Sequence, residues 1–235
     1  YTSGFRPPFS INLLMGRYEA ALTLMVNLLG LLGGLYLSDK FRKQGLNSMI
    51  VYLVLIMSLN VVIMTRDIFN LFVFLEVASI ATAGLILLEK NILSLSAGFK
   101  YMIATGIIAG LLLIGIIFSY QIAGSLNLDD LYTSNLSVFK AGGVAVFLIL
   151  ISAIFELKPF PANGWGLDVY EGAPAGFSAI ISSGIATAGL YILYKLLPLG
   201  GDTWHPAIVV IGLVTFVGSN LLGLNQTNAK RLLGY

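Results

Sequence analysis

Four ionisable side chains interrupt segments that are otherwise apolar, and a charge in such a place can hold or pass an ion. They are Glu76, Lys100, Glu156 and Lys158. Glu76 lies nine residues beyond Asp67 in a nearly continuous apolar run, so a helical rise of about 1.5 Å per residue places it roughly 14 Å inside. Charge at that depth of a membrane costs at least ~2.5 kcal/mol, so the carboxyl group should face a polar interior or be neutral. We predict that Glu76 binds a proton or a cation; the alternative is a structural acid paired with a neighbouring helix.

The other three side chains each admit more than one interpretation. Lys100 lies about 12 Å along its own apolar run, where it either belongs to a polar axis with Glu76 or is a buried counter-ion that fixes helix packing. Glu156 and Lys158 stand at the end of another run. They are a relay, an interfacial pair or contacts to a partner subunit, and with Glu76 and Lys100 they form the predicted ion-translocation site.

The composition predicts that membrane-spanning helices position these groups. Of 235 residues, 57% are hydrophobic and only 10% are charged, whereas a soluble domain carries about 25% charged residues. The apolar runs cover residues 11–37, 49–64, 68–88, 92–120, 141–157, 174–197 and 207–224. We therefore predict an all-α, polytopic transmembrane helical bundle of about seven spans, forming one domain over residues 1–235 in the cell membrane.

A break is expected after the fifth run. Pro159 and Pro161 flank Phe160, and each proline removes a backbone donor and clashes with the preceding turn. Irregular backbone at membrane depth is stable only when it is buried in protein or lines a cavity, and transporters often place broken helices at their sites. The segment near Pro159 is therefore either a broken helix or the loop after a helix that ends at Leu157.

Several classes of function are excluded by what the chain lacks. It has no cysteine and one histidine, His205, so it cannot hold an iron–sulfur cluster by thiolates, and haem or a zinc site is disfavoured. We expect no cofactor and no redox site in this chain. A net charge of +2 with scattered basic residues gives no nucleic-acid surface.

The basic residues also predict which side of the membrane each loop faces. If all seven runs span, seven basic residues lie on one side: Lys40, Arg42, Lys43, Lys90, Lys158, Lys230 and Arg231. Five lie on the other side: Arg6, Arg17, Arg66, Lys140 and Lys195. The side with more basic residues is cytoplasmic by the positive-inside rule, and the N-terminus is outside.

Six further charged residues are interpreted without a functional role. Arg17 and Glu19 fall at interfacial depth and are expected to snorkel or to form a local ion pair. Lys195 and His205 stand at the ends of apolar runs, where an interfacial position is expected. Asp168 and Glu171 are interpreted as loop acids that hold a turn.

Four stretches of the chain, in order, resemble one protein family. They are residues 67–76, residues 99–101 together with 120–128, residues 165–174, and residues 226–235. Together they are similar to the large antiporter-like subunits shared by Mrp cation/proton antiporters, respiratory complex I and group 4 membrane-bound hydrogenases. The second stretch resembles the Mrp D-type pattern.

The resemblance implies a function and a larger assembly. It implies that the chain holds roughly the third to ninth of about fourteen helices, including one inverted repeat, and is a fragment of a longer subunit. Such a subunit moves protons or sodium ions beside other membrane subunits, while a partner module performs the redox chemistry of an oxidoreductase complex. Two alternatives remain: a structural subunit that has lost conduction, and a subunit of a free-standing Mrp antiporter.

The resemblance also implies where the polar residues should lie. The family's fifth-helix glutamate corresponds to Glu76, but its seventh-helix lysine corresponds to Glu156 and its eighth-helix lysine falls near Thr187. The histidine usually found before the tryptophan corresponds to Asn163. A second carboxylate near Glu76 would repel it rather than pair with it, so this chain departs from the family's relay.

Overall fold

The computed structural model describes residues 4, 5, 10–134, 136 and 140–235, and Arg6 lies outside them. The longer helices are α1 (Arg17–Tyr36), α3 (Leu46–Met64), α4 (Ile68–Ile86), α5 (Ile92–Ala123), α7 (Lys140–Glu156), α10 (Ala186–Leu196) and α11 (Trp204–Gly223). The shorter helices are α2 (Ser38–Gln44), α6 (Leu128–Thr133), α8 (Gly164–Gly172), α9 (Ala175–Ile180) and α12 (Ala229–Gly234). One π-helical turn, Ile181–Ile185, joins α9 to α10.

Five helical segments of the described chain are long and apolar enough to cross a membrane. They are Arg17–Tyr36, Leu46–Met64, Ile68–Glu89, Ile92–Ala123 and Ala175–Gly223. The last runs from α9 to α11 and reverses direction near Gly201, whose φ of 62° suits glycine. The prediction of an all-helical protein that crosses the membrane several times is therefore confirmed.

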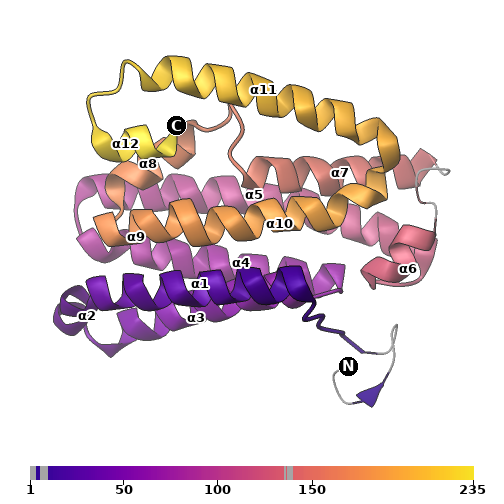
Figure 1. Cartoon of the computed structure of the whole chain (residues 1–235), viewed down its shortest axis with the longest axis horizontal. Coiled ribbons are helices and arrows are strands. Elements are labelled where there is room, and N and C mark those ends of the chain that lie inside the picture. Colours follow the sequence, from indigo (N-terminus) through magenta and orange to yellow (C-terminus); the bar gives the residue numbers. More distant parts are fainter. Residues whose placement is uncertain (1–3, 6–9, 135, 137–139) are drawn as a thin grey trace.

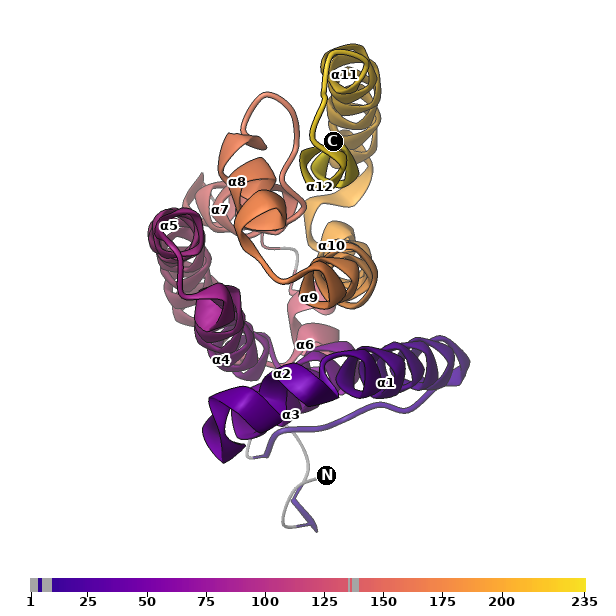
Figure 2. The same ribbon diagram turned by 90° about the vertical axis from the view of Figure 1, so that its left-hand side faces the viewer.

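The long helices lie side by side along one axis (Figure 1). Viewed from the end, α1 and α3 form one edge, α4 and α5 flank the middle, and α11 lies at the opposite edge (Figure 2). The α5 helix packs against α4, α7 and α8, and α3 packs against α4. Large apolar side chains such as Ile107, Leu213 and Phe216 face outward, which suits helices surrounded by lipid or by other membrane helices.

A network of backbone hydrogen bonds fixes the short link between α3 and α4. The Arg66 N–H donates to the carbonyl of Asn12 at 3.0 Å, and the Arg66 carbonyl accepts from the Leu128 N–H at 2.8 Å. Asp67 caps α4 by accepting the Asn70 N–H at 2.7 Å. These contacts set the start of the helix that carries Glu76.

Lys195 lies at a helix end, as expected, but its side chain is buried in the protein, so the expected snorkelling is wrong. The residue is only 3% exposed. Its ammonium donates to the carbonyls of Val62, Ile63 and Thr65 at 2.7, 3.1 and 2.9 Å. The last carbonyls of a helix have no partner within that helix and favour a nearby cation. Lys195 therefore caps the end of α3 from α10.

Glu19 is also buried, and its carboxylate is hydrogen-bonded within the protein instead of snorkelling. The residue is 6% exposed, and its carboxylate accepts hydrogen bonds from the Tyr191 hydroxyl and from the Gly16 N–H, the latter at 3.1 Å. A buried charge needs such partners; Gly16 is three positions from Glu19 and Tyr191 is 172 positions away. The prediction of a snorkelling or locally paired Glu19 is wrong.

Asp168 and Glu171 lie within α8 and not in a loop. The Arg231 guanidinium donates to both carboxylates, at 2.9 Å to Asp168 and 2.7 Å to Glu171. Lys230 donates to the carbonyl of Ala173 at 2.8 Å. The two acids therefore attach α12 to α8.

The Lys195 cap on α3 should contribute to the stability of the fold. Replacing Lys195 with Met removes three charge-assisted hydrogen bonds and leaves buried carbonyls without a donor, so the free energy of unfolding should fall by about 3 kcal/mol. Lys195→Arg should cost less because it keeps a cation. Thermal denaturation of the purified protein measures this, with Lys140→Met, an exposed lysine at the same end, as the control. Equal midpoints for Lys195→Met and Lys140→Met would contradict the cap.

Candidate functional site

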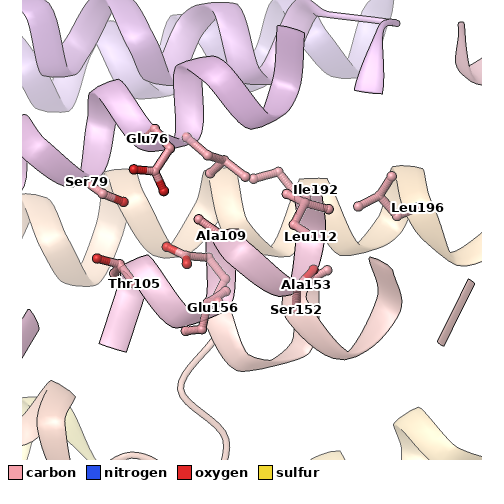
Figure 3. Close-up of a pocket in the computed structure, with 12 residues that line it drawn as sticks. Glu76, Ser79, Thr105, Ala109, Leu112, Ser152, Ala153, Glu156, Ile192 and Leu196 are labelled. Carbon is pink, nitrogen blue, oxygen red and sulfur yellow. The ribbon is translucent and has the colours of Figure 1, made fainter. Parts of the chain in front are cut away.

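Glu76 and Glu156 face one small cavity between four helices. Figure 3 shows both carboxylates pointing toward the same space, with the hydroxyls of Ser79 and Thr105 beside them. The cavity has a volume of about 20 Å³, which is room for roughly one water molecule. Two predicted site residues that are 80 positions apart in the chain, Glu76 and Glu156, are therefore brought together.

Helical spacing explains how the polar groups converge. Residues three or four apart share one face of a helix, which puts Glu76 with Ser79 on α4 and Ser152 with Glu156 on α7. Thr105 on α5 donates its hydroxyl to the carbonyl of Tyr101 at 2.9 Å. Because that bond uses only the donor, the lone pairs of its oxygen remain available to an ion or a water molecule.

A second cavity of about 10 Å³ lies next to the first. Both cavities are lined by Leu75, Ser79, Glu156 and Ile192. The smaller one also includes Thr82, whose buried hydroxyl oxygen has no hydrogen-bond partner of ordinary geometry among the described residues. Its volume is close to the minimum for one ordered water. Polar oxygens therefore extend on both sides of Glu156.

The electrostatics of the site favour a bound positive charge. In the part of the chain that the structure describes, neither Glu76 nor Glu156 makes an ion pair of 4 Å or less, and neither accepts a hydrogen bond from a side chain. Two carboxylates in a low-dielectric cavity repel each other. A proton or cation between them removes this repulsion.

Lys158 lies just after α7, next to Glu156, in the segment that connects α7 to α8. Its ammonium stands over the ring of Trp165 at 5.3 Å from the ring centroid, a cation–π contact. Gly166 leaves room for this side chain, because a Cβ there would lie 2.7 Å from Lys158 Cδ. The Lys158 side chain is thus held against α8.

The connecting segment is packed against the middle of α11. The Phe160 N–H donates to the Thr215 hydroxyl at 3.2 Å. The Phe160 ring packs so closely on Gly218 that a Cβ added there would lie 2.6 Å from the Phe160 Cδ1 atom. A backbone donor that would otherwise be unpaired at this depth is thereby satisfied. Glu156 ends its helix at this segment, inside the bundle.

Lys100 is not part of the cavity. Its side chain is 52% exposed and forms an ion pair with Asp168 at 2.5 Å. Neither expectation for Lys100, a polar axis or a counter-ion for Glu76, matches this placement, because the residue faces α8. Thr187, near the family's eighth-helix lysine, lines an apolar groove between α1 and α10, and Asn163 is buried at the start of α8.

The sequence interpretation missed the hydroxyl groups of the site. Ser79, Thr105 and Ser152 line the cavity, and two of them could have been found from their spacing of three or four residues to Glu76 or Glu156. Thr105 carries no such signal, since it comes from a helix with no residue in the cavity that the sequence had singled out.

The chain matches known proteins over most of its length. Residues 65–235 match the family described as NADH:quinone oxidoreductase/Mrp antiporter, transmembrane. NADH-quinone oxidoreductase subunit N of Rubrobacter xylanophilus is 31% identical over 72% of this chain and 37% of that protein. A Na⁺/H⁺ antiporter subunit of Bacillus subtilis is 28% identical over 99% of this chain and 49% of that protein.

A solved structure agrees with these relatives. A chain of the membrane-bound sulfane sulfur reductase, an archaeal respiratory membrane complex, superimposes with a TM-score of 0.91 and 28% identity, covering 100% of this chain and 50% of that one. This chain thus spans about half or less of the length of the proteins it matches. Because the family match covers 171 of its 235 residues, the chain belongs to the transmembrane family shared by NADH:quinone oxidoreductase and Mrp antiporter subunits.

Proposed function

We propose that this chain is part of an ion-translocating membrane subunit of a respiratory complex in the cell membrane, and that protons or sodium ions pass through the Glu76–Glu156 cavity. The observation that carries the proposal is the pair of carboxylates, without ion-pair partners among the described residues, facing one small cavity that is otherwise lined by hydroxyl-bearing and apolar side chains. Intramembrane acids are functional by default. Electrons would be handled by partner subunits.

The arrangement supports a simple cycle. One ion held between Glu76 and Glu156 neutralises their repulsion, and the hydroxyl oxygens of Ser79 and Thr105 can replace part of its hydration. Lys158 stands beside Glu156, so a small movement of its ammonium toward that carboxylate would displace the ion. A partner module that moves the connecting segment could in this way drive release.

We further propose seven crossings with one interrupted helix. In this description α1, α3, α4, α5, α7 with α8, α9 with α10, and α11 each cross once, and they include one inverted repeat. Support for the interruption comes from the segment around Pro159, which lies between α7 and α8 and packs against the middle of α11. Lys100 would then position α8 through Asp168.

The alternative of a structural subunit without conduction has one observation in its favour. The two cavities beside Glu156 have volumes of about 20 and 10 Å³, which hold about one water each and not a continuous file. Conduction would therefore require a more open state. A free-standing Mrp-type antiporter differs in lacking redox subunits, so co-purification of the assembled complex distinguishes it from a respiratory subunit.

Replacing Glu76 with Gln tests the proposed site. Vesicles carrying the assembled complex should lose at least ten-fold in ion uptake, because the amide cannot take up a proton or balance a cation. Glu89→Gln is the matched control: Glu89 lies at the end of the same apolar segment and pairs with Lys40. Assembly and redox turnover are checked in both variants. Unchanged uptake in Glu76→Gln would mean that the ions cross elsewhere.

Replacing Glu156 tests whether two acids act as a pair. Glu156→Gln should lower ion uptake at least ten-fold, because Glu76 alone would hold its ion without a second carboxylate to receive it. Glu156→Asp keeps the charge and should retain a measurable part of the uptake. Initial rates in the same vesicles provide the measurement. Full uptake in Glu156→Gln, with Glu76→Gln inactive, would show that a single acid suffices.

A further inference from the structure

We propose that a groove between α1 and α3 binds one anionic phospholipid, with the phosphate at Arg42 and an acyl chain along the two helices. The groove has a volume of about 660 Å³ and extends from Asn27 on α1 and Ile56 on α3 to Arg42 near the end of α2. These helices form one edge of the bundle (Figure 2). The groove shares no described lining residue with the two small cavities beside the acid pair, so the proposal does not depend on the proposed function.

The walls of the groove are fixed by packing between α1, α2 and α3. Gly30 and Gly34 are four residues apart on α1, so both lie on one face of that helix. The Tyr52 hydroxyl donates to the Gly30 carbonyl at 2.7 Å, and a Cβ added at Gly34 would lie 3.3 Å from Tyr52 Cε1. The centroid of the Phe41 ring lies 5.2 Å from that of the Tyr52 ring. All four residues line the groove, which therefore exists before any ligand enters.

The length of the groove matches one leaflet of a bilayer. On α3 it extends from Leu46 to Ile56, which at the helical rise is about 15 Å. Half of a hydrocarbon core of about 30 Å has the same length. Ile56 lies near the middle of the candidate span Leu46–Met64, and Leu46 begins that span. The groove thus runs from mid-membrane to the membrane surface, as an acyl chain does.

The polar groups of the groove suit a phospholipid at both ends. At the deep end, the Asn27 amide donates to the Thr23 carbonyl at 2.7 Å and to Asn60 Oδ1 at 3.0 Å, so an acyl chain meets no unused amide hydrogen there. At the surface end, Arg42 is the one charged residue among the described residues that line the groove. It forms no ion pair of 4 Å or less in the described part of the chain. A guanidinium can bind a phosphate through two parallel hydrogen bonds.

The surroundings of Arg42 favour an anionic lipid over a helix of another protein. Arg42 and Lys43 end α2, in the link between two candidate spans, and the positive-inside rule places this link on the cytoplasmic side. That leaflet carries anionic lipids, and basic pockets between membrane helices on this side bind their headgroups. A helix in the groove would need an acid opposite Arg42 at the same depth, whereas every anionic phospholipid has a phosphate there.

Photo-crosslinking of the assembled complex tests the site. The complex is placed in phosphatidylcholine vesicles that contain a phosphatidylglycerol analogue with a diazirine in its acyl chain, and cross-linked peptides are identified by mass spectrometry. Cross-links should fall on exposed groove residues such as Leu31 and Leu53. The same diazirine on a phosphatidylcholine analogue should label these residues at least five-fold less. Equal labelling by the two analogues, or a groove without cross-links because a protein segment covers it, would overturn the proposal.

Two matched pairs of variants separate binding in the groove from general lipid contact. Arg42→Gln should lower labelling by the phosphatidylglycerol analogue at least five-fold, because it removes the phosphate contact. Lys43→Gln, an adjacent exposed cation outside the lining, should change it less than two-fold. Met49→Trp fills the groove and should also lower labelling, whereas Ile50→Trp should not: Met49 and Ile50 are 46% and 48% exposed, but only Met49 lines the groove. Equal effects within either pair would contradict the site.

Discussion

The absence of water from the bilayer interior is the constraint on which this structure depends. Every buried polar group must find its partner within the protein, and most of them do. Lys195 uses its three donors on three carbonyls, Glu19 accepts from Tyr191 and Gly16, and the Phe160 N–H reaches Thr215. Glu76 and Glu156 are different, because among the described residues neither carboxylate has an ion pair or accepts a hydrogen bond from a side chain. The buried Thr82 hydroxyl in the adjoining cavity is a further exception, and these neighbouring exceptions are what support the proposed site.

The α7 helix brings the second acid to the cavity, and the connection between α7 and α8 begins directly after it. Had α7 continued as a regular helix, Glu156 would be one side chain along a wall, with its backbone carbonyl engaged in the next turn. Ending the helix at Glu156 instead leaves a short segment that α11 must cover, and the Phe160–Thr215 and Phe160–Gly218 contacts do so. The α11 helix thus covers the segment that follows Glu156.

The sequence predicts well where along a helix a residue lies, but it predicts poorly which neighbouring element the side chain faces. Apolar runs located the long helices, and the single acid in residues 68–88 located Glu76, because both signals lie within one element. Lys100 lies on the long helix that was expected, but its helical face turns toward Asp168 on α8, and counting residues cannot reveal which neighbour a face meets. Lys195 and Glu19 find their partners 130 or more positions away, so their burial could not be read locally. Asp168 and Glu171 were assigned to a loop because α8 is only nine residues long.

An acid in place of the family's seventh-helix lysine changes what the site must hold at rest. A lysine and a glutamate neutralise each other and need no ion between them. Two carboxylates in a cavity with room for about one water repel each other when both are charged, so in the proposed site the resting state would contain a proton or a cation. Lys158 lies in the connecting segment over the ring of Trp165, and in the proposed cycle it would act on the occupied site from outside it. The substitution at Glu156 therefore favours a site that stores an ion between steps over one that only relays charge.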